Sequence, residues 1–149
     1  MDDQTAVLTA ITEYREAFNT GDVDRLMSVF GTGFTDMSFG VPSFYGEEAA
    51  LVLRRRMTEL FSEYRADMKI SVIDVVIKTD VAYDFGWHIL TLNPKTGGSP
   101  IKSRQRYFQL WARQPDGSWK IKFYIDNVDQ APAMPDAQFS IPYLSAAVL

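Results

Sequence analysis

The first third of the chain places apolar residues at the three- and four-residue spacing of amphipathic helices. The expected helices span residues 4–18, 23–30 and 47–64. Gly21 and Asp22 stand between the first two, where a glycine suits a helix end and an aspartate suits a helix N-cap. The short run 34–39 predicts a strand, and the segment 40–46, which begins and ends with glycine, predicts a loop.

From residue 68 onward the pattern changes to long strands. Four stretches are rich in β-branched and aromatic residues: 68–78, 81–93, 101–113 and 119–128. The turn signals between them are Thr79-Asp80, the segment 93–100 and the segment 114–118, both of which contain proline and glycine. Helices followed by an antiparallel meander predict an α+β fold with three N-terminal helices packed on one face of a curved antiparallel sheet.

The other face of this sheet also needs a cover. The strand over 70–77 is apolar at odd and even positions alike. In the next-but-one strand we expect Phe108 and Leu110 on one face, and Tyr107 and Trp111 on the other. A sheet open to water on one side alternates more cleanly than this. We therefore expect a homodimer through the outer sheet face, with the segment 131–149 as the competing cover.

Composition and charge remove several classes of function. The chain has 149 residues, enough for one domain, and no cysteine, which excludes disulfides and thiolate metal sites. A single histidine, His88, excludes a histidine pair. The net charge of −4 argues against nucleic-acid binding. The N-terminus is acidic and no apolar run approaches the ~20 residues of a membrane span, so we expect a cytoplasmic protein without membrane contact.

Three short segments carry a family resemblance. They are Tyr-Arg-Glu-Ala-Phe-Asn-Thr-Gly-Asp at 14–22, Leu-Met-Ser-Val-Phe at 26–30 and Asp-Gly-Ser-Trp-Lys-Ile at 116–121. Together with the order of elements, they resemble the nuclear transport factor 2-like superfamily and, within it, the ketosteroid isomerase and SnoaL-like polyketide cyclase branch. The resemblance implies a cone-shaped, cystatin-like fold with an apolar pocket. It implies a domain over 1–130, with 131–149 as an extension that packs on the domain or on a dimer partner.

The resemblance also implies candidate catalytic positions. Steroid isomerases use a tyrosine on the first helix, an aspartate base on the first strand and a protonated aspartic acid on a later strand. The tyrosine corresponds to Tyr14, the base position falls on Ser38 with Asp36 two residues earlier, and the acid position falls on Arg106. A serine cannot abstract a carbon-bound proton unaided, and an arginine cannot act as a neutral acid. Steroid isomerisation by the family's mechanism is therefore not expected.

We expect a cofactor-free isomerase, dehydratase or cyclase that acts on an apolar ring compound. Tyr14 and Arg106 would stabilise an enolate-like oxyanion while Asp36 moves the proton. Three alternatives stay open. Tyr14 can be a core tyrosine, Asp36 and Arg106 can form a structural ion pair, and the whole domain can be a non-catalytic ligand-binding or dimerisation module.

The expected pocket holds a small apolar or acidic molecule, with no metal and no cofactor. Its implied lining consists of Phe18, Phe34, Ser38, Trp87, Arg104, Phe108, Tyr124 and Asp126. His88 then points outward to the dimer side, although a slip of one residue would exchange it with Trp87. The run 54–56 of three arginines is interpreted as a solvated helix face paired with Glu59.

Overall fold

The helices begin where the sequence supplies a cap or an acidic first turn. In the computed structural model, which describes residues 1–129 and 147–148, α1 (Asp3–Thr20) begins after Asp2, whose carboxylate accepts the Thr5 N–H at 2.8 Å. α1 ends at Gly21, which has a φ of +68°. α2 (Val23–Met27) is capped by Asp22 in the same way, and α3 (Gly46–Glu63) carries two glutamates in its first turn.

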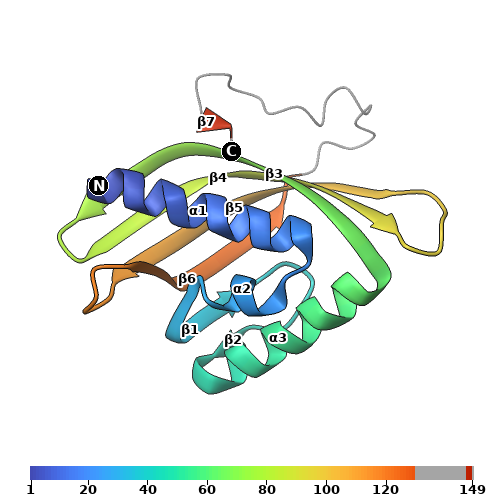
Figure 1. Cartoon of the computed structure of the whole chain (residues 1–149), viewed down its shortest axis with the longest axis horizontal. Coiled ribbons are helices and arrows are strands. Elements are labelled where there is room, and N and C mark those ends of the chain that lie inside the picture. The colour runs from blue at the N-terminus through green and yellow to red at the C-terminus, as the bar shows by residue number, and fades with distance from the viewer. Residues whose placement is uncertain (130–146, 149) are drawn as a thin grey trace.

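The strands of the described residues form one sheet. They are β1 (Phe30–Met37), β2 (Phe44–Tyr45), β3 (Tyr64–Lys78), β4 (Val81–Pro94), β5 (Ile101–Arg113), β6 (Trp119–Val128) and β7 (Ala147–Val148). Their order across the sheet is β2-β1-β6-β5-β4-β3-β7. Every neighbouring pair is antiparallel except β1 with β6, which run parallel. β1, which precedes the meander of β3 to β6, therefore lies beside the last strand of that meander (Figure 1).

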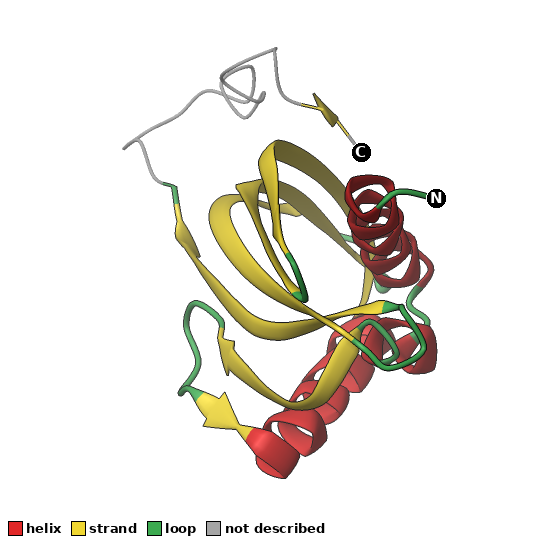
Figure 2. Cartoon of the chain, turned by 90° about the vertical axis from the view of Figure 1, so that its left-hand side faces the viewer, coloured by secondary structure: helices red, strands yellow, loops and turns green. Residues whose placement is uncertain are grey.

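The sheet curves strongly, and α1 and α3 lie along one side of it (Figure 2). Part of this curvature comes from a bulge in β3 between Val72 and Asp74, opposite Gly86 of β4. A β-carbon on Gly86 would lie 1.8 Å from the carbonyl oxygen of Ser71, which is far inside van der Waals contact. Only glycine therefore fits at this point, where the backbones of β3 and β4 approach closely.

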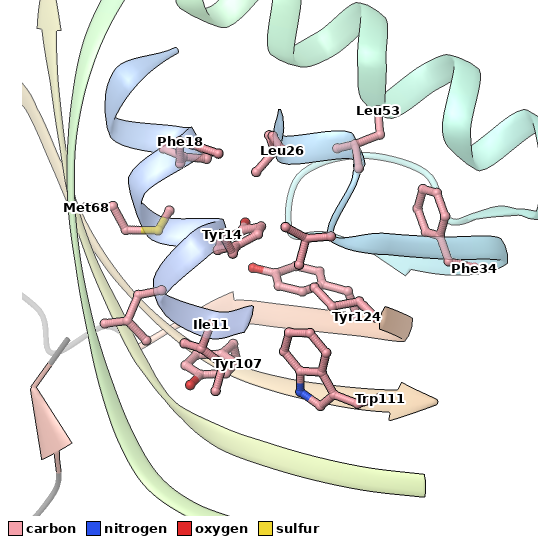
Figure 3. Close-up of a cluster of buried hydrophobic side chains, with 14 of the residues drawn as sticks. Ile11, Tyr14, Phe18, Leu26, Phe34, Leu53, Met68, Tyr107, Trp111 and Tyr124 are labelled. Carbon is pink, nitrogen blue, oxygen red and sulfur yellow. The ribbon is translucent and has the colours of Figure 1, made fainter. Parts of the chain in front are cut away.

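The core fills the space between the helices and the inner face of the sheet (Figure 3). α1 contributes Val7, Ile11 and Phe18, and the sheet contributes Trp111 and Ile121, all of them buried. None of the helices in the described part of the chain is long and apolar enough to cross a membrane.

The predicted α+β fold is confirmed, with several boundaries moved. The second helix ends at Met27 instead of residue 30, because the carbonyl of Val29 already accepts the N–H of Ile121 at 2.9 Å and draws the chain into the sheet. The predicted loop at 40–46 contains the short strand β2, which pairs with Thr35 and Asp36 of β1. The third helix ends at Glu63, so β3 starts at Tyr64 instead of residue 68.

The predicted faces of β4 and β5 were wrong. Tyr107 and Trp111 lie on the inner, buried face, and so does His88, whereas Trp87 and Phe108 lie on the outer face. Aromatic residues occupy both faces of these strands, so hydrophobicity alone did not distinguish them. The expected packing of 131–149 lies outside the described residues, apart from the pairing of Ala147 and Val148 with β3.

Candidate functional site

A cavity of about 200 Å³ lies between α1, α3 and β1 on one side and the inner faces of β3 to β6 on the other. Its apolar lining includes Phe18, Leu53, Met57, Leu60, Met68 and Leu90. The polar side chains of the lining come from helices and strands that are far apart in the sequence, so the complete fold is needed to bring them together.

The first polar group is the carboxylate of Asp36 on β1, a residue that is 2% exposed. Its Oδ1 accepts the backbone N–H of Ser38 at 3.0 Å and the hydroxyl of the same serine. Its Oδ2 accepts a hydrogen bond from Nη1 of Arg56 on α3 at 3.1 Å. The buried carboxylate therefore has both a cation and two neutral donors, as a buried charge requires.

The second polar group is Asp126 on β6. Its Oδ1 accepts the N–H of Phe39 at 2.6 Å, and its Oδ2 accepts the hydroxyl of Tyr124 at 2.6 Å. Tyr124 and Asp126 are two residues apart and share a strand face. Burial raises the pKa of the Asp126 carboxyl, and the negative charge of Asp36 adds to this, while the hydrogen bonds from Tyr124 and Phe39 oppose it.

Two tyrosines extend this arrangement. Tyr14 of α1 and Tyr124 of β6 both project into the space between the helix and the strand (Figure 3). Burial raises the pKa of Tyr14 well above its usual range, and the charges of Asp126 and Asp36 act in the same direction, while a hydrogen bond with Tyr124 opposes them. Burial raises the pKa of Tyr124 as well. Both phenols therefore keep their protons at neutral pH.

His88 completes the inner wall. Its ring is 1% exposed, stacks on Tyr107 and lies 5.9 Å from the ring of Tyr14. Burial lowers its pKa to about 3, so the imidazole is uncharged. Nδ1 lies 3.4 Å from the hydroxyl of Tyr124, and that hydroxyl already donates its hydrogen bond to Asp126. A hydrogen bond here therefore requires the ring proton on Nδ1.

Six of the residues expected in the site do line this cavity. They are Tyr14, Phe18, Asp36, Ser38, Tyr124 and Asp126. Phe34 does not: it is buried and lines a separate hollow beside Gly46 and Ala50, between β1 and α3. Its expected place in the pocket was wrong: Phe34 is buried like Asp36 two residues later, but its ring packs against Phe30, beside the start of α3 instead of in the cavity.

Four expected site residues lie on the outer face of the sheet. Trp87 donates its indole N–H to Asp129 at 2.8 Å, and Arg104 forms an ion pair with the same carboxylate. Phe108 stacks with Tyr83. Arg106 is hydrogen-bonded to Asn127 and does not approach Asp36, so the expected pair between them was wrong.

Sequence reasoning missed Arg56, His88 and Gln105, all of which line the cavity. Arg56 could have been found, because it lies three residues after Leu53 and four before Leu60, on the apolar side of α3. The arginine run is accordingly not one solvated face. Arg54 is paired with Asp24 on the surface, and Arg56 points into the cavity toward Asp36.

No metal centre is formed within the described ranges, where no three His, Cys, Asp or Glu residues come together closely enough to hold an ion. The polar groups of the cavity are instead suited to moving protons and holding a partial charge, since they combine carboxylates, phenols and one guanidinium inside an apolar wall.

No protein-family model and no curated protein sequence matches the chain. Solved structures do match its fold. A ketosteroid isomerase-like protein from Erwinia carotovora atroseptica has a TM-score of 0.75 at 20% identity, covering 88% of this chain and 100% of that one. A hexachlorocyclohexane dehydrochlorinase from Novosphingobium barchaimii has a TM-score of 0.69 at 15% identity, covering 88% and 91%.

A third solved structure that matches is described as having a cystatin-like fold. A nuclear transport factor 2-like protein with a cystatin-like fold, from Novosphingobium aromaticivorans, has a TM-score of 0.70 at 15% identity and covers 88% of this chain and 84% of that one. The chain thus has a cavity-forming α+β fold. That fold is the nuclear transport factor 2-like, cystatin-like fold, as the three sequence segments indicated.

Proposed function

We propose that the protein is a cofactor-independent enzyme that moves a proton on a small, largely apolar ring compound. The observation that carries this proposal is the setting of Asp126. Its carboxylate lies in an apolar cavity, burial raises its pKa, and its partners Tyr124 and Phe39 are uncharged. A carboxylate of this kind is a stronger base than one in water, which is what abstraction of a carbon-bound proton needs.

Asp126 suits the role of proton acceptor better than Asp36 does. Within the described part of the chain, each oxygen of Asp126 accepts one hydrogen bond from a neutral donor and so keeps a lone pair for a second. Oδ1 of Asp36 already accepts two hydrogen bonds from Ser38, and its Oδ2 is held by the guanidinium of Arg56. We therefore assign proton transfer to Asp126, and we assign to Asp36 the task of holding Arg56 in the cavity wall.

In the proposed reaction a C–H bond next to a carbonyl or a leaving group breaks, and the proton moves to Asp126. With a carbonyl, the electron pair passes to the oxygen as an enolate. The buried, protonated phenol of Tyr14 then donates a hydrogen bond to that oxygen, and Asp126 returns the proton at a second carbon. With a leaving group on the neighbouring carbon, the electron pair of the C–H bond forms a carbon–carbon double bond, and the leaving group departs as an anion in an elimination. The dehydrochlorinase named among the solved structures of this fold is compatible with that second course.

The test is exchange of α-protons for deuterium in single-ring ketones such as cyclohexanone and 2-cyclohexenone, followed by NMR in D₂O. The wild-type chain should accelerate exchange, and Asp126→Asn should lower the rate by at least ~100-fold, the usual contribution of a positioned base. Asp67→Asn, on the exposed surface of β3, is the matched control and should leave the rate unchanged.

Equal rates for wild type and Asp126→Asn would contradict the proposal. Saturable binding of these ketones without any exchange would instead support a non-catalytic ligand-binding domain, the second function that such a cavity permits.

We also propose a homodimer through the outer face of the sheet. The observation that favours it is a hollow lined by Phe85, Trp87, Phe108 and Ile125, in which Phe85 is 38% and Phe108 36% exposed. Large aromatic residues that share an exposed patch are typical of interfaces. The residues that support the dimer are thus different from Tyr107 and Trp111, on which the sequence-based expectation rested.

A further inference from the structure

Among the described residues, two carboxyl groups and one guanidinium line the cavity, so with both acids ionised its charged groups carry a net negative charge. These groups are Asp36, Asp126 and Arg56. His88 adds no positive charge, since it is buried and uncharged. The remaining polar side chains of the lining are neutral. A ligand that enters this space meets more negative than positive charge. Because the apolar wall screens charges less than water does, the ligand's own charge interacts strongly with these groups.

Arg56 is the one cation that the described residues contribute to the lining, and it already forms an ion pair with Asp36. Its Nη1 lies 3.1 Å from Oδ2 of Asp36, whose side chain is 3% exposed. A ligand carboxylate that took Arg56 for itself would leave Asp36 buried without its cation. Removing one partner from a buried pair is strongly unfavourable. A ligand carboxylate that shared Arg56 would instead place a second negative charge beside Asp36.

A groove next to the cavity also carries acidic side chains. Arg56, Met57 and Leu60 of α3 line both the cavity and a groove that continues to Glu63 and Tyr64. Glu59 lies in the same groove, and the last turn of α3 contains no basic residue. The groove that shares these residues with the cavity therefore carries two glutamates, and the negative end of the helix dipole lies beside it at Glu63.

From these three observations we infer that the cavity selects uncharged ligands about the size of one substituted ring and rejects their carboxylate analogues, with Asp36 as the residue that sets this preference by occupying Arg56. The volume of about 200 Å³ gives the size, since a cavity of about 150 Å³ holds benzene. The inference rests on the proposed function for the site. It narrows the sequence-based expectation of an apolar or acidic ligand to the uncharged case.

Benzamide and benzoate are a suitable pair of probes, because they have nearly the same shape and differ in charge. Their dissociation constants for the wild-type chain are measured by NMR titration at pH 7.5. We expect benzamide to bind at least 10-fold more tightly than benzoate. Equal affinities, tighter binding of benzoate, or binding of neither probe would overturn the inference.

The variant Asp36→Asn tests the role assigned to Asp36. It keeps the shape of the side chain and frees Arg56, so benzoate should bind at least 10-fold more tightly than to wild type, while benzamide should change less than 3-fold. Asp24→Asn is the matched control, because Asp24 of α2 pairs with Arg54, which lies on the exposed side of α3 two residues before Arg56. It should change neither constant.

A failure of Asp36→Asn to fold is detected by circular dichroism, and Asp36→Ser, which also removes the carboxylate from beside Arg56, then replaces it. If benzoate affinity does not rise in a folded variant at position 36, the inference is wrong. Binding is measured without turnover, so loss of this selectivity and loss of α-proton exchange are separate results. An inactive protein can still prefer benzamide, and an active one can still fail to do so.

Discussion

The imidazole of His88 lies nearly parallel to the phenol ring of Tyr107, with 4.2 Å between ring centroids and 20° between planes. Behind this stack, the hydroxyl of Tyr107 donates to the buried carboxylate of Asp84 at 2.7 Å. Trp111 donates its indole N–H to the other oxygen at 2.6 Å. The ring stack of the inner wall is thus hydrogen-bonded to one buried acid that has two neutral donors. Because His88 and Asp84 are both buried, the stability of the folded protein should depend on pH in two opposite ways.

His88 should make the folded state less stable in acid. The unfolded residue binds a proton near pH 6.5, whereas burial lowers the pKa in the folded state to about 3. The unfolded state therefore binds more protons between these values, and stability falls by roughly 1.4 kcal/mol for each pH unit below 6.5. His88→Phe keeps the stacked ring and removes this dependence. Urea unfolding at pH 7, 5.5 and 4.5 checks it, and parallel curves for both proteins would contradict it.

Asp84 should act in the opposite direction. Burial raises its pKa from 3.8 to about 6, while the hydrogen bonds from Trp111 and Tyr107 lower it in part. The stability that its protonated form contributes is present below pH 3.8 and is lost as the pH rises through about 6, a change of about 3 kcal/mol. In Asp84→Asn this loss is absent. The unfolding free energy of the variant minus that of wild type should therefore rise by most of this amount between pH 4 and pH 7.

The pH dependences of stability that come from His88 and Asp84 partly cancel in the wild-type chain. Each is therefore measured as the difference between wild type and the variant at that residue. A constant difference between Asp84→Asn and wild type across this pH range would show that the carboxyl group keeps its ordinary pKa in the folded state.

Gly86→Ala should be among the most damaging single-methyl additions to the sheet. The new β-carbon would lie 1.8 Å from the carbonyl oxygen of Ser71, which is backbone and cannot rotate away. We expect a loss of more than about 3 kcal/mol, or failure to fold. Gly31→Ala is the control, because its β-carbon would meet the side chain of Lys120 at 3.3 Å. Thermal unfolding compares them, and similar midpoints would be inconsistent with the observed bulge.

The outer face should mediate dimerisation. Sedimentation of the wild-type chain at micromolar concentration should give twice the chain mass of 16.9 kDa. Phe85→Asp and Phe108→Asp each place a charge in the exposed aromatic patch and should give a folded monomer. Leu51→Asp is the control, since Leu51 is 71% exposed on α3, away from this face. A wild-type chain that sediments as a monomer would rule out the dimer.

Much of the fold could be predicted because local signals agreed with it. Gly21 and Asp22 mark a real helix end and a real cap, and the long strands follow their β-branched runs. The faces of β4 and β5 could not be predicted from hydrophobicity, because Trp87 and Phe108 are as apolar as Tyr107 and Trp111. The two inner aromatic residues differ from the outer ones in a specific polar contact, since Tyr107 and Trp111 both donate hydrogen bonds to the buried Asp84.

The candidate site was predictable in part for a similar reason. Tyr14, Asp36 and Asp126 follow from the family resemblance and the alternation along a strand. The partner of Asp36 depends on which strand lies next to β1 and which helix crosses it. The nearest cation proved to be Arg56 on α3, and no spacing along β5 could show that.

The parallel pairing of β1 with β6 also affects how the chain folds as it is synthesised. Asp36 lies opposite Tyr124 in this pairing, so two walls of the cavity come from segments that are far apart in the sequence and are synthesised at different times. A nascent chain on the ribosome has no binding site until β6 has emerged, and no ligand can stabilise it before then. Until that moment the inner sides of α1 and α3 lack part of their cover, and this is when the protein is most exposed to aggregation and proteolysis.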